Sequence, residues 1–359
     1  MTTYAAAPLT DLLSALFQEA GATTEVAETT AAILVEGDLL GHHTHGTKLA
    51  QGYLKDLKAG HACGDHQRLE IVESSPVAAT IDGHYLLGPY LVQRALTHAQ
   101  QAADGFGIGI VSLKRSHHIA CLAAYLRPLV ERNLIPLVLS SDPAVASVAP
   151  YGGTTPVYTP NPLAIGIPGR EHPLLIDVSM STITNGTVNK TRAEGGKLAH
   201  PAILTHRGTV SDDPEDFFTT PPGSILPLGE KAFGHKGFAL GLMIEALTSA
   251  LSGYGRKDAP TGWGASVTVM VIDPARFGGT DAFLDETGFL AQRCLDAERA
   301  DPDVAVRLPG QSGLAKRQGY LRDGIPLPED VVASLRQAVA DSAQAKSALG
   351  RSLGLSQEG

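Results

Sequence analysis

The chain has 359 residues, of which 43% are apolar and 18% are charged, and its formal net charge is −9. This composition is typical of a globular protein long enough for two domains, and the scattered lysines and arginines make nucleic acid or an anionic membrane unexpected partners. No signal-peptide pattern and no apolar run near the ~18 residues of a membrane span occur, which predicts a cytoplasmic protein. The three cysteines, Cys63, Cys121 and Cys294, lie too far apart to suggest a disulfide framework or a cysteine-based zinc site.

Hydrophobic periodicity predicts a helical beginning followed by a mixture of strands and helices. Apolar residues recur at helical spacing in two helices between residues 8 and 36, and again from 48 to 58. From about residue 70, short apolar runs typical of buried strands alternate with helical stretches, which indicates an α/β layer with at least some parallel pairing. The predicted strands are 71–72, 77–81, 108–113, 135–139, 174–176 and 267–272, and the predicted helices are 91–103, 122–132, 238–251 and 328–349.

These patterns predict two domains. Residues 1–70 form a helical domain that residues 313–359 complete, and residues 71–312 form an α/β domain. Residues 183–224 are rich in Thr, Gly, Pro and Asp and carry few apolar side chains. They are expected to make a long excursion over the surface rather than a linker between domains.

Three imidazoles fall within four positions in the stretch Gly41-His-His-Thr-His-Gly46, directly after a predicted helix. Histidine is the side chain whose ordinary pKa lies near neutrality, so a histidine held between glycines at a helix end can give and take protons. Proton transfer is therefore the first hypothesis for this stretch. The alternative, that single members such as His42 are only solvated turn residues, stays open.

Polar residues also follow three predicted strands. They are Ser116-His117-His118, Ser140-Ser141-Asp142, and Asp177-Val-Ser-Met-Ser181. Open α/β sheets bind ligands beyond the carboxyl ends of their strands, so the three clusters predict one shared crevice. The alternative is that these residues only cap the next helices.

The usual nucleotide-binding fingerprints are absent, because no Gly-x-Gly-x-x-Gly follows a strand and no P-loop occurs. Gly234-His235-Lys236-Gly237, just before a predicted helix, is a candidate anion cradle, since helix-start N–H groups attract phosphate or carboxylate. The clustered histidines could also be metal ligands, although no His-Glu-x-x-His spacing supports them. No Gly-x-Ser-x-Gly elbow of a serine nucleophile is present.

Taken together, the ordered motifs resemble the type-2 malate/L-lactate dehydrogenase family, which includes ureidoglycolate, sulfolactate, diketogulonate and piperideine/pyrroline-2-carboxylate oxidoreductases. The resemblance covers about residues 10–325. The motifs are Asp38-Leu-Leu-Gly-His-His-Thr-His-Gly46, Ser116-His-His118, Pro143-Ala-Val-Ala, Pro150-Tyr-Gly-Gly153, Pro160-Asn-Pro-Leu-Ala164, Asp177-Val-Ser-Met-Ser181, Gly234-His-Lys-Gly237 and Arg307-Leu-Pro-Gly310.

The resemblance implies a non-Rossmann α/β fold, a mixed sheet with flanking helices plus a mostly helical domain. It also implies a homodimer that uses NAD or NADP to move a hydride to or from C2 of a small 2-oxo or 2-hydroxy carboxylate, or of a cyclic 2-imino acid. The α/β domain then binds the cofactor and the substrate. The residues implied for catalysis are His45 and His118 as candidate proton donors, Asp177 as a tautomer-fixing carboxylate, and Lys236 for a carboxylate or phosphate.

By the same resemblance, Thr44, His45 and Lys48 lie at the substrate. The residues implied for cofactor binding are Ser116, Ser140, Asn161, Asp177, Ser179, Ser181, His235, Lys236 and Gly310. No metal site is implied.

The chain departs from the family pattern at Leu49, where many members carry an arginine, at Thr187, often a lysine, and at Thr44, usually a serine. These departures leave the substrate open. Lys190 or Arg192 is expected to meet a 2′-phosphate, which favours NADPH over NADH. A metal-dependent hydrolase or lyase built on the histidines, and a relative without catalytic activity, are the competing hypotheses.

Overall fold

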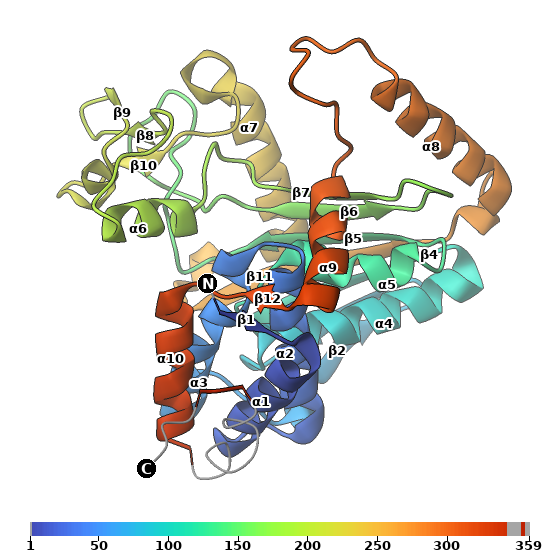
Figure 1. The fold of residues 1–359 in the computed structure, drawn as a ribbon, viewed down its shortest axis with the longest axis horizontal. Helices are drawn as coiled ribbons and strands as arrows, with labels where there is room; N and C mark the ends of the chain where they lie inside the picture. Colours follow the sequence, from blue (N-terminus) through green and yellow to red (C-terminus); the bar gives the residue numbers. More distant parts are fainter. Residues whose placement is uncertain (1, 343–352, 356–359) are drawn as a thin grey trace.

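The structure is a computed structural model that describes residues 2–342 and 353–355, and its α/β class agrees with the prediction (Figure 1). A seven-stranded sheet has the order β2–β3–β4–β11–β5–β6–β7. Only the β3–β4 pair is parallel, and the helix α4 makes the long crossover that a parallel pair needs. The strands are β2 (Glu70–Ser74), β3 (Ala78–Asp82), β4 (Ile108–His117), β5 (Ile135–Ser141), β6 (Leu163–Ile167), β7 (Leu174–Val178) and β11 (Gly264–Ile272).

Helix α4 (Gly88–Phe106) packs directly on β4 and β11. Its backbone comes so close to the sheet that a Cβ at Gly109 would overlap the Ala99 carbonyl oxygen. The helix runs past the predicted end at Gly105, because Gly107 supplies the left-handed C-cap with φ of 86°. The buried side chains of α4 therefore form one core with the inner face of the sheet.

Helices from both ends of the chain form a second layer (Figure 1). Strand β1 (Thr3–Tyr4) pairs antiparallel with β12 (Ile325–Pro326), which brings the C-terminal segment back onto the first helices. All four residues of the apolar stripe predicted near the C-terminus, Val331, Val332, Leu335 and Val339, are buried. The helices are α1 (Ala6–Glu19), α2 (Thr24–Leu39), α3 (Ala50–Ala59), α9 (Gln311–Asp323) and α10 (Glu329–Ala340).

The division into domains at residues 70 and 313 stays a prediction. One core cluster runs from α1 through α4 to β11, so the helical layer and the sheet share their apolar interior. The predicted end of the last helix at Leu349, like residues 343–352 and 356–359 of the predicted domain, lies outside the described residues.

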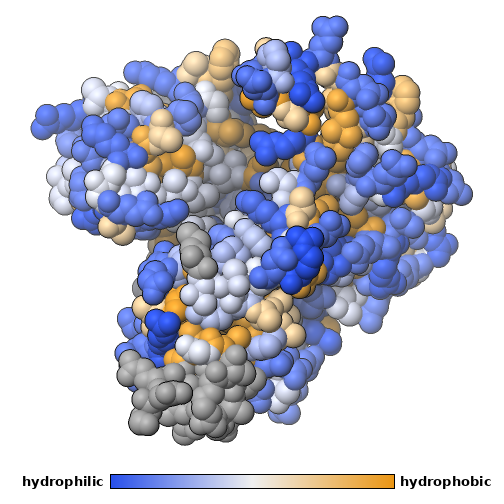
Figure 2. Space-filling model, viewed as in Figure 1, coloured by the Kyte–Doolittle hydropathy of each residue, from blue (hydrophilic) through white to orange (hydrophobic). Residues whose placement is uncertain are grey.

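Residues 183–224 are more ordered than predicted. They contain α6 (Asn185–Ala193) and a three-stranded sheet of β8 (Ile203–Leu204), β9 (Val210–Ser211) and β10 (Ser224–Ile225). The few apolar residues of the segment converge with Tyr158 on a small separate core, which a count along the sequence could not show. The resulting lobe projects beside the main sheet, and the face in Figure 2 is hollowed between this lobe and the helical layer.

Two further predicted helices differ in the structure. Residues 122–132 form a 3₁₀ turn (Leu122–Tyr125) and the short helix α5 (Arg127–Val130), with Pro128 in its first turn. Helix α7 (Glu230–Glu245) begins eight residues before the predicted start at Phe238. Phe233 interrupts it with non-helical angles, so Gly234–Gly237 form the first turn after a kink, and a π-helical segment, Ala246–Ala250, continues it.

The sequence prediction missed β6 and α8 (Thr280–Leu295), which projects from the body in Figure 1. Across residues 2–342 and 353–355, no helix has both the length and the apolar character needed to cross a bilayer.

Candidate active site

A cleft of about 660 Å³ lies where the predicted polar clusters meet. The 3₁₀ turn His43–His45, the ends of β4, β5 and β7, and the start of α6 all contribute to its walls. The prediction of one shared crevice is confirmed, because members of all three clusters line this cleft. The predicted residues that line the cleft are Thr44, His45, His118, Ser140, Asn161, Asp177 and Ser179.

His45 and His118 face each other in this cleft. Their rings are stacked, with centroids 6.1 Å apart and planes 26° apart. Thr44 Oγ1 lies 3.0 Å from His45 Nδ1. Burial lowers the pKa of His45, and burial lowers the pKa of His118 well below its usual value, with a further contribution from His45. Both imidazoles are therefore neutral near pH 7. A neutral imidazole can accept a proton at one nitrogen and donate a hydrogen bond from the other.

A buried carboxylate holds the turn that carries His45. Asp38, at the end of α2, is 1% exposed, and its two oxygens lie 2.9 Å from His43 Nδ1 and 2.7 Å from the Thr47 N–H. A Cβ at Gly46 would overlap this carboxyl group, so glycine is required there. The glycine bracket of the histidine stretch thus serves the close approach of the turn to Asp38.

Aromatic rings surround His118 on the other side. Trp263 stacks on it with centroids 4.5 Å apart, and the Tyr53 hydroxyl lies 2.9 Å from His118 Nδ1. Beneath them His117 is fully buried, and its Nε2 lies 3.0 Å from Asp56 Oδ2. This packing fixes the plane of the His118 ring.

Asp177 follows β7 and lies in the same cleft. Its Oδ2 accepts a hydrogen bond of 2.9 Å from the Ala123 N–H. Burial raises the pKa of this carboxyl group, and the neighbouring His42 opposes the shift. No contact between Asp177 and His45 or His118 is found among the described residues, so its predicted tautomer-fixing role stays a prediction.

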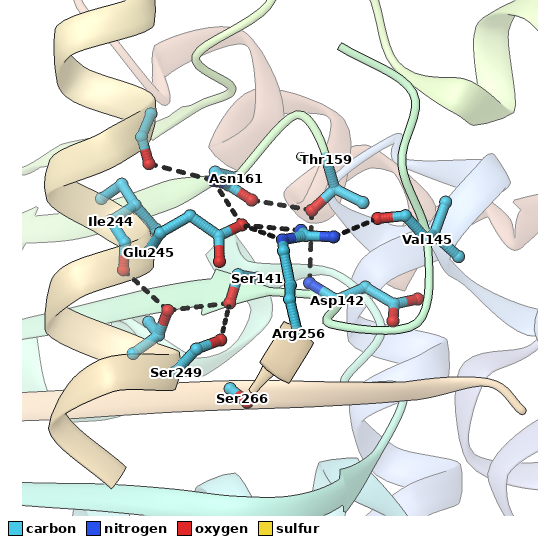
Figure 3. Close-up of polar contacts among 12 residues, drawn as sticks. Ser141, Asp142, Val145, Thr159, Asn161, Ile244, Glu245, Ser249, Arg256 and Ser266 are labelled. Carbon is cyan, nitrogen blue, oxygen red and sulfur yellow. Dashed lines mark hydrogen bonds and ion pairs between the residues drawn. The ribbon is translucent and has the colours of Figure 1, made fainter. Parts of the chain in front are cut away.

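A polar network supports the wall formed by the end of β5 (Figure 3). Arg256 donates to Glu245 from Nε at 3.1 Å and Nη2 at 2.6 Å, and Asn161 Nδ2 donates to the same carboxylate at 3.1 Å. Asn161 Oδ1 accepts from Thr159, whose hydroxyl in turn accepts from the Asp142 N–H. The Asn161 side chain is therefore engaged inside the protein, and the structure gives it a supporting position rather than a free amide.

Asp142 lines the cleft at the end of this network. Its Oδ1 accepts a hydrogen bond of 2.9 Å from the Ala144 N–H. Burial, the largest cause, raises the pKa of Asp142 to about 6, and Arg256 only partly offsets it.

The structure does not bring six of the predicted site residues to the cleft. Ser116 is fully buried and donates to the His117 carbonyl, and Ser181 is 3% exposed and donates to the Ile183 carbonyl. Lys48 Nζ lies 2.9 Å from Asp330 Oδ2 at the surface. The remaining three are His235, Lys236 and Gly310.

His235 and Lys236 are exposed on the first turn of α7 after the kink. The His235 ring packs edge-on against Tyr151, and Lys236 Nζ lies 5.3 Å from the Phe233 ring. Gly310 is the N-cap of α9 with φ of 85°, and a Cβ there would come 2.8 Å from the Leu175 nitrogen. The close approach of the backbone to β7 explains why a glycine is needed at this position.

The departures noted in the sequence have consequences in the cleft. Leu49 and Thr187 both line it, and within residues 2–342 and 353–355 its lining contains neither lysine nor arginine. Arg192 is held by Glu215 at 2.9 Å and lies 4.1 Å from the Phe218 ring, whereas Lys190 is 3.9 Å from Glu194. Neither basic residue reaches the cleft.

Sequence reasoning did not assign Tyr53, Trp263 or Glu245 to the site. Trp263 is the one tryptophan of the chain and precedes a predicted strand, which is the only signal that could have found it. Among residues 2–342 and 353–355, no group of three or more His, Cys, Asp or Glu side chains is placed to hold a metal ion. The hypothesis of a histidine-based metal hydrolase therefore has no ligand set in that part of the chain.

Comparison with known proteins gives consistent matches along most of the chain. A family model described as malate/L-lactate dehydrogenase matches residues 4–336. A (2R)-3-sulfolactate dehydrogenase (NADP(+)) from Chromohalobacter salexigens is 30% identical over 337 residues, covering 90% of this chain and 94% of the relative. A Δ1-pyrroline-2-carboxylate/Δ1-piperideine-2-carboxylate reductase from Pseudomonas putida is 27% identical over 341 residues, covering 92% and 94%.

Solved structures show the same fold. Malate dehydrogenase from Entamoeba histolytica superposes with a TM-score of 0.89 at 20% identity, covering 95% of this chain and 98% of that one. The Δ1-piperideine-2-carboxylate reductase from Pseudomonas syringae has a TM-score of 0.81 at 25% identity, covering 94% and 100%.

Proposed function

Because the chain belongs to the malate/L-lactate dehydrogenase family, we propose that it is an NAD(P)-dependent oxidoreductase acting at C2 of a small 2-oxo or 2-hydroxy carboxylate. The observation that carries the proposal is the pairing of His45 with His118 in one cleft. Two imidazoles at 6.1 Å, each with a pKa lowered by burial, suit an exchange of one proton with a developing alkoxide or amine.

Two observations support a nicotinamide cofactor in the cleft. Its volume of about 660 Å³ lies within the usual range for small-molecule sites, roughly 300–1,000 Å³. Asn185 Oδ1, at the start of α6, is buried without a partner among the described residues and belongs to the lining. Ser140, Ser179 and Asn185 would hold the cofactor, which supplies the hydride when bound.

The chain's own groups have separate tasks in this proposal. His118 exchanges the proton with the substrate oxygen or nitrogen, and His45 lies beside it at the same substrate atom. Thr44 orients His45 through the 3.0 Å contact at Nδ1. Trp263 covers the His118 ring and excludes water from that side.

A cyclic 2-imino acid is the second candidate substrate, and the charges of the cleft favour it. The lining contains two carboxyl groups, Asp142 and Asp177, and no lysine or arginine among the described residues. A cyclic 2-imino acid with a protonated imine and a carboxylate carries no net charge, and such a lining accepts it more readily than a dianion. The similarity to two piperideine-2-carboxylate reductases supports the same candidate.

We also propose a preference for NADPH. The relative from Chromohalobacter salexigens, named for NADP(+), supports it. Lys190 lies outside the cleft lining, but its contact with Glu194 is long, at 3.9 Å, whereas Glu215 holds Arg192 at 2.9 Å, so Lys190 is the better candidate for a 2′-phosphate that extends beyond the cleft. Lys190→Ala should raise KM for NADPH about tenfold and leave KM for NADH unchanged, and Arg192→Ala is the matched control. Equal affinities of the wild-type protein for NADH and NADPH would contradict the preference.

A cytoplasmic homodimer completes the proposal. The side chains of Leu240, Met243, Leu247 and Leu251 recur at helical spacing and are exposed along α7 and its π-helical continuation. An apolar row of this kind suits an interface with a second copy. The three free cysteines suit a reducing compartment. Sedimentation of the purified protein as a monomer would contradict the dimer.

The test of the function is the loss of reduced-nicotinamide absorbance, in EDTA, with NADH and NADPH. The panel contains pyruvate, oxaloacetate, larger 2-oxo acids, and five- and six-membered cyclic 2-imino acids. Turnover of at least one compound is expected and would name the substrate class. Failure of both cofactors to bind would contradict the proposal, and binding without turnover across the panel would favour a relative without catalytic activity.

A further inference from the structure

The Nδ1 atom of His118 has two neighbours of different chemistry. The Tyr53 hydroxyl lies 2.9 Å from it, and the Ala120 N–H points at it from 3.3 Å. The same hydroxyl lies 2.9 Å from the His118 carbonyl oxygen, to which it can also donate. Tyr53 is 0% exposed, so water does not compete for these contacts.

The two neighbours support different protonation states of the ring. The Ala120 N–H can only donate, so it matches a bare Nδ1 and opposes a protonated one. The Tyr53 hydroxyl can donate to a bare Nδ1, or it can donate to the His118 carbonyl and accept from Nδ1–H. Among the described residues, the hydroxyl is thus the one group at Nδ1 that fits either state.

We propose that Tyr53 is a positioning residue whose hydroxyl accepts a hydrogen bond from Nδ1–H while it donates to the His118 carbonyl, so that His118 can gain and lose a proton at Nε2 while buried. An unpaired N–H in a buried position is costly, and a bond to a charged group is worth more than one to a neutral group. Without the hydroxyl, the charged ring would present Nδ1–H to the Ala120 N–H. The neutral ring with a bare Nδ1 would keep the hydrogen bond from the Ala120 N–H, so loss of the hydroxyl would destabilise it less than the charged ring.

The consequence for catalysis rests on the proposed function. In the reducing direction, the Nε2–H bond of charged His118 breaks and its proton forms the new O–H or N–H bond of the product. His118 remains as the neutral ring with Nδ1–H on Tyr53, and solvent returns the proton. In the oxidising direction the same neutral ring accepts the substrate proton at Nε2. Tyr53 keeps Nδ1 paired in both directions.

Other groups around His118 also influence its pKa. His45 from the 3₁₀ turn and His117 from β4 both lower its pKa, after burial as the largest cause. Trp263 stacks on its face without titrating. Asp56 on α3 contacts His117 rather than His118. Substitution of Tyr53 leaves all of these groups in place.

The chain offers a matched control. Tyr125 is also buried, and its hydroxyl donates to the Ile119 carbonyl at 2.5 Å without touching an imidazole. Tyr53→Phe and Tyr125→Phe each delete one buried hydroxyl and keep the ring. The Tyr53 ring packs against His117 and Trp263, so the phenylalanine preserves that packing. Thermal melts of both variants establish that they fold.

The direct measurement is the NMR titration of the His118 imidazole in the substrate-free protein, assigned with His118→Gln. Tyr53→Phe should lower the pKa of His118 by about one unit or more, the scale of a hydrogen bond to a charged group. Tyr125→Phe should leave it unchanged. An unchanged or raised pKa in Tyr53→Phe, an equal shift in Tyr125→Phe, or no protonation of wild-type His118 before unfolding would each overturn the proposal.

A second measurement uses turnover in the reducing direction. Reduction needs the charged ring, so activity is lost as pH rises through the pKa of His118, and Tyr53→Phe should move this limb to lower pH. At pH 7 kcat should fall about tenfold or more, with KM for the cofactor within twofold of wild type. An unmoved limb would overturn the role of Tyr53. Absence of turnover in the wild type would count against the proposed function alone, because the titration still decides the role of Tyr53.

Discussion

Two polar assemblies border the cleft, and their hydrogen-bonding capacity is used to different degrees. Around Glu245, the guanidinium of Arg256 and the amide of Asn161 both donate to Glu245 Oε1 inside the protein. Around His118, Nδ1 is paired with Tyr53 while no partner of Nε2 is found among the described residues. The first assembly is suited to hold a wall in place, and the second is suited to exchange a proton.

The difference shows why polar residues at a cleft need not share a task. Asn161 lies just before β6 and His118 directly follows β4, and both residues line the same cavity. Asn161 adopts a positive φ of 47° and turns its amide inward, where the amide donates to Glu245 and accepts from Thr159. His118 keeps Nε2 without a hydrogen-bond partner among the described residues. The variants below separate the two assemblies, beginning with the largest expected effect.

Removal of the His118 imidazole should abolish most of the catalysis. His118→Gln should lower kcat by about 10²–10⁴ and leave the melting temperature and cofactor binding close to wild type, since general acid–base groups contribute that much. His45→Ala should cost at least about a hundredfold by the same reasoning. Steady-state kinetics measure both, with the exposed His200→Gln as control. Near-normal turnover in His118→Gln would assign the proton to His45.

Disruption of the network around Glu245 should lower the stability of the fold more than it lowers turnover. Glu245→Ala leaves Arg256 and the Asn161 amide without their partly buried acceptor, and should lower the free energy of unfolding by about 2–3 kcal/mol. Denaturant titration measures the change. The exposed pair of Arg170 with Asp281 is the matched control, and Arg170→Ala should leave the free energy of unfolding nearly unchanged. Equal losses in the two variants would remove the distinction between a supporting network and a surface pair.

Asp142 should give stability a pH dependence. Its pKa of about 6 in the folded state exceeds the ordinary value of 3.8, so folding favours the protonated carboxyl. The contribution of Asp142 to the free energy of unfolding is therefore greatest below pH 4. It is lost as the pH rises through 6. Asp142→Asn should raise stability at pH 7 by about 1–2 kcal/mol and flatten this slope. Melts across pH 4–7 that match wild type would contradict the assigned pKa.

Local patterns in the sequence predicted the parts of the fold that local physics determines. The apolar stripe of α10 and the buried strand before Ser116 follow from periodicity alone, and His118 was found because it follows that strand. The start of α7 was missed because Gly234 and Gly237 resemble helix breakers, whereas a Cβ at Gly237 would overlap Leu228. Close packing between segments, rather than the local turn, requires that glycine.

Contacts between distant segments explain the errors at the site. Lys48 is drawn to Asp330 on the returning C-terminal helix, and Ser116 turns away from the cleft into the core. Trp263 reaches His118 only because β11 pairs with β4. No spacing along the chain encodes these contacts. The residue types of the site could be predicted from the sequence, but their orientations could not.

The most direct test of the account follows the hydride itself. The wild-type protein is incubated with a compound that it reduces and with NADPH or NADH carrying deuterium at C4 of the nicotinamide, and the product is examined by NMR and mass spectrometry. The account predicts one deuterium at C2 of the product and a proton from solvent on the adjacent oxygen or nitrogen. Product without deuterium at C2, with either face of the nicotinamide labelled, would contradict hydride transfer in this cleft.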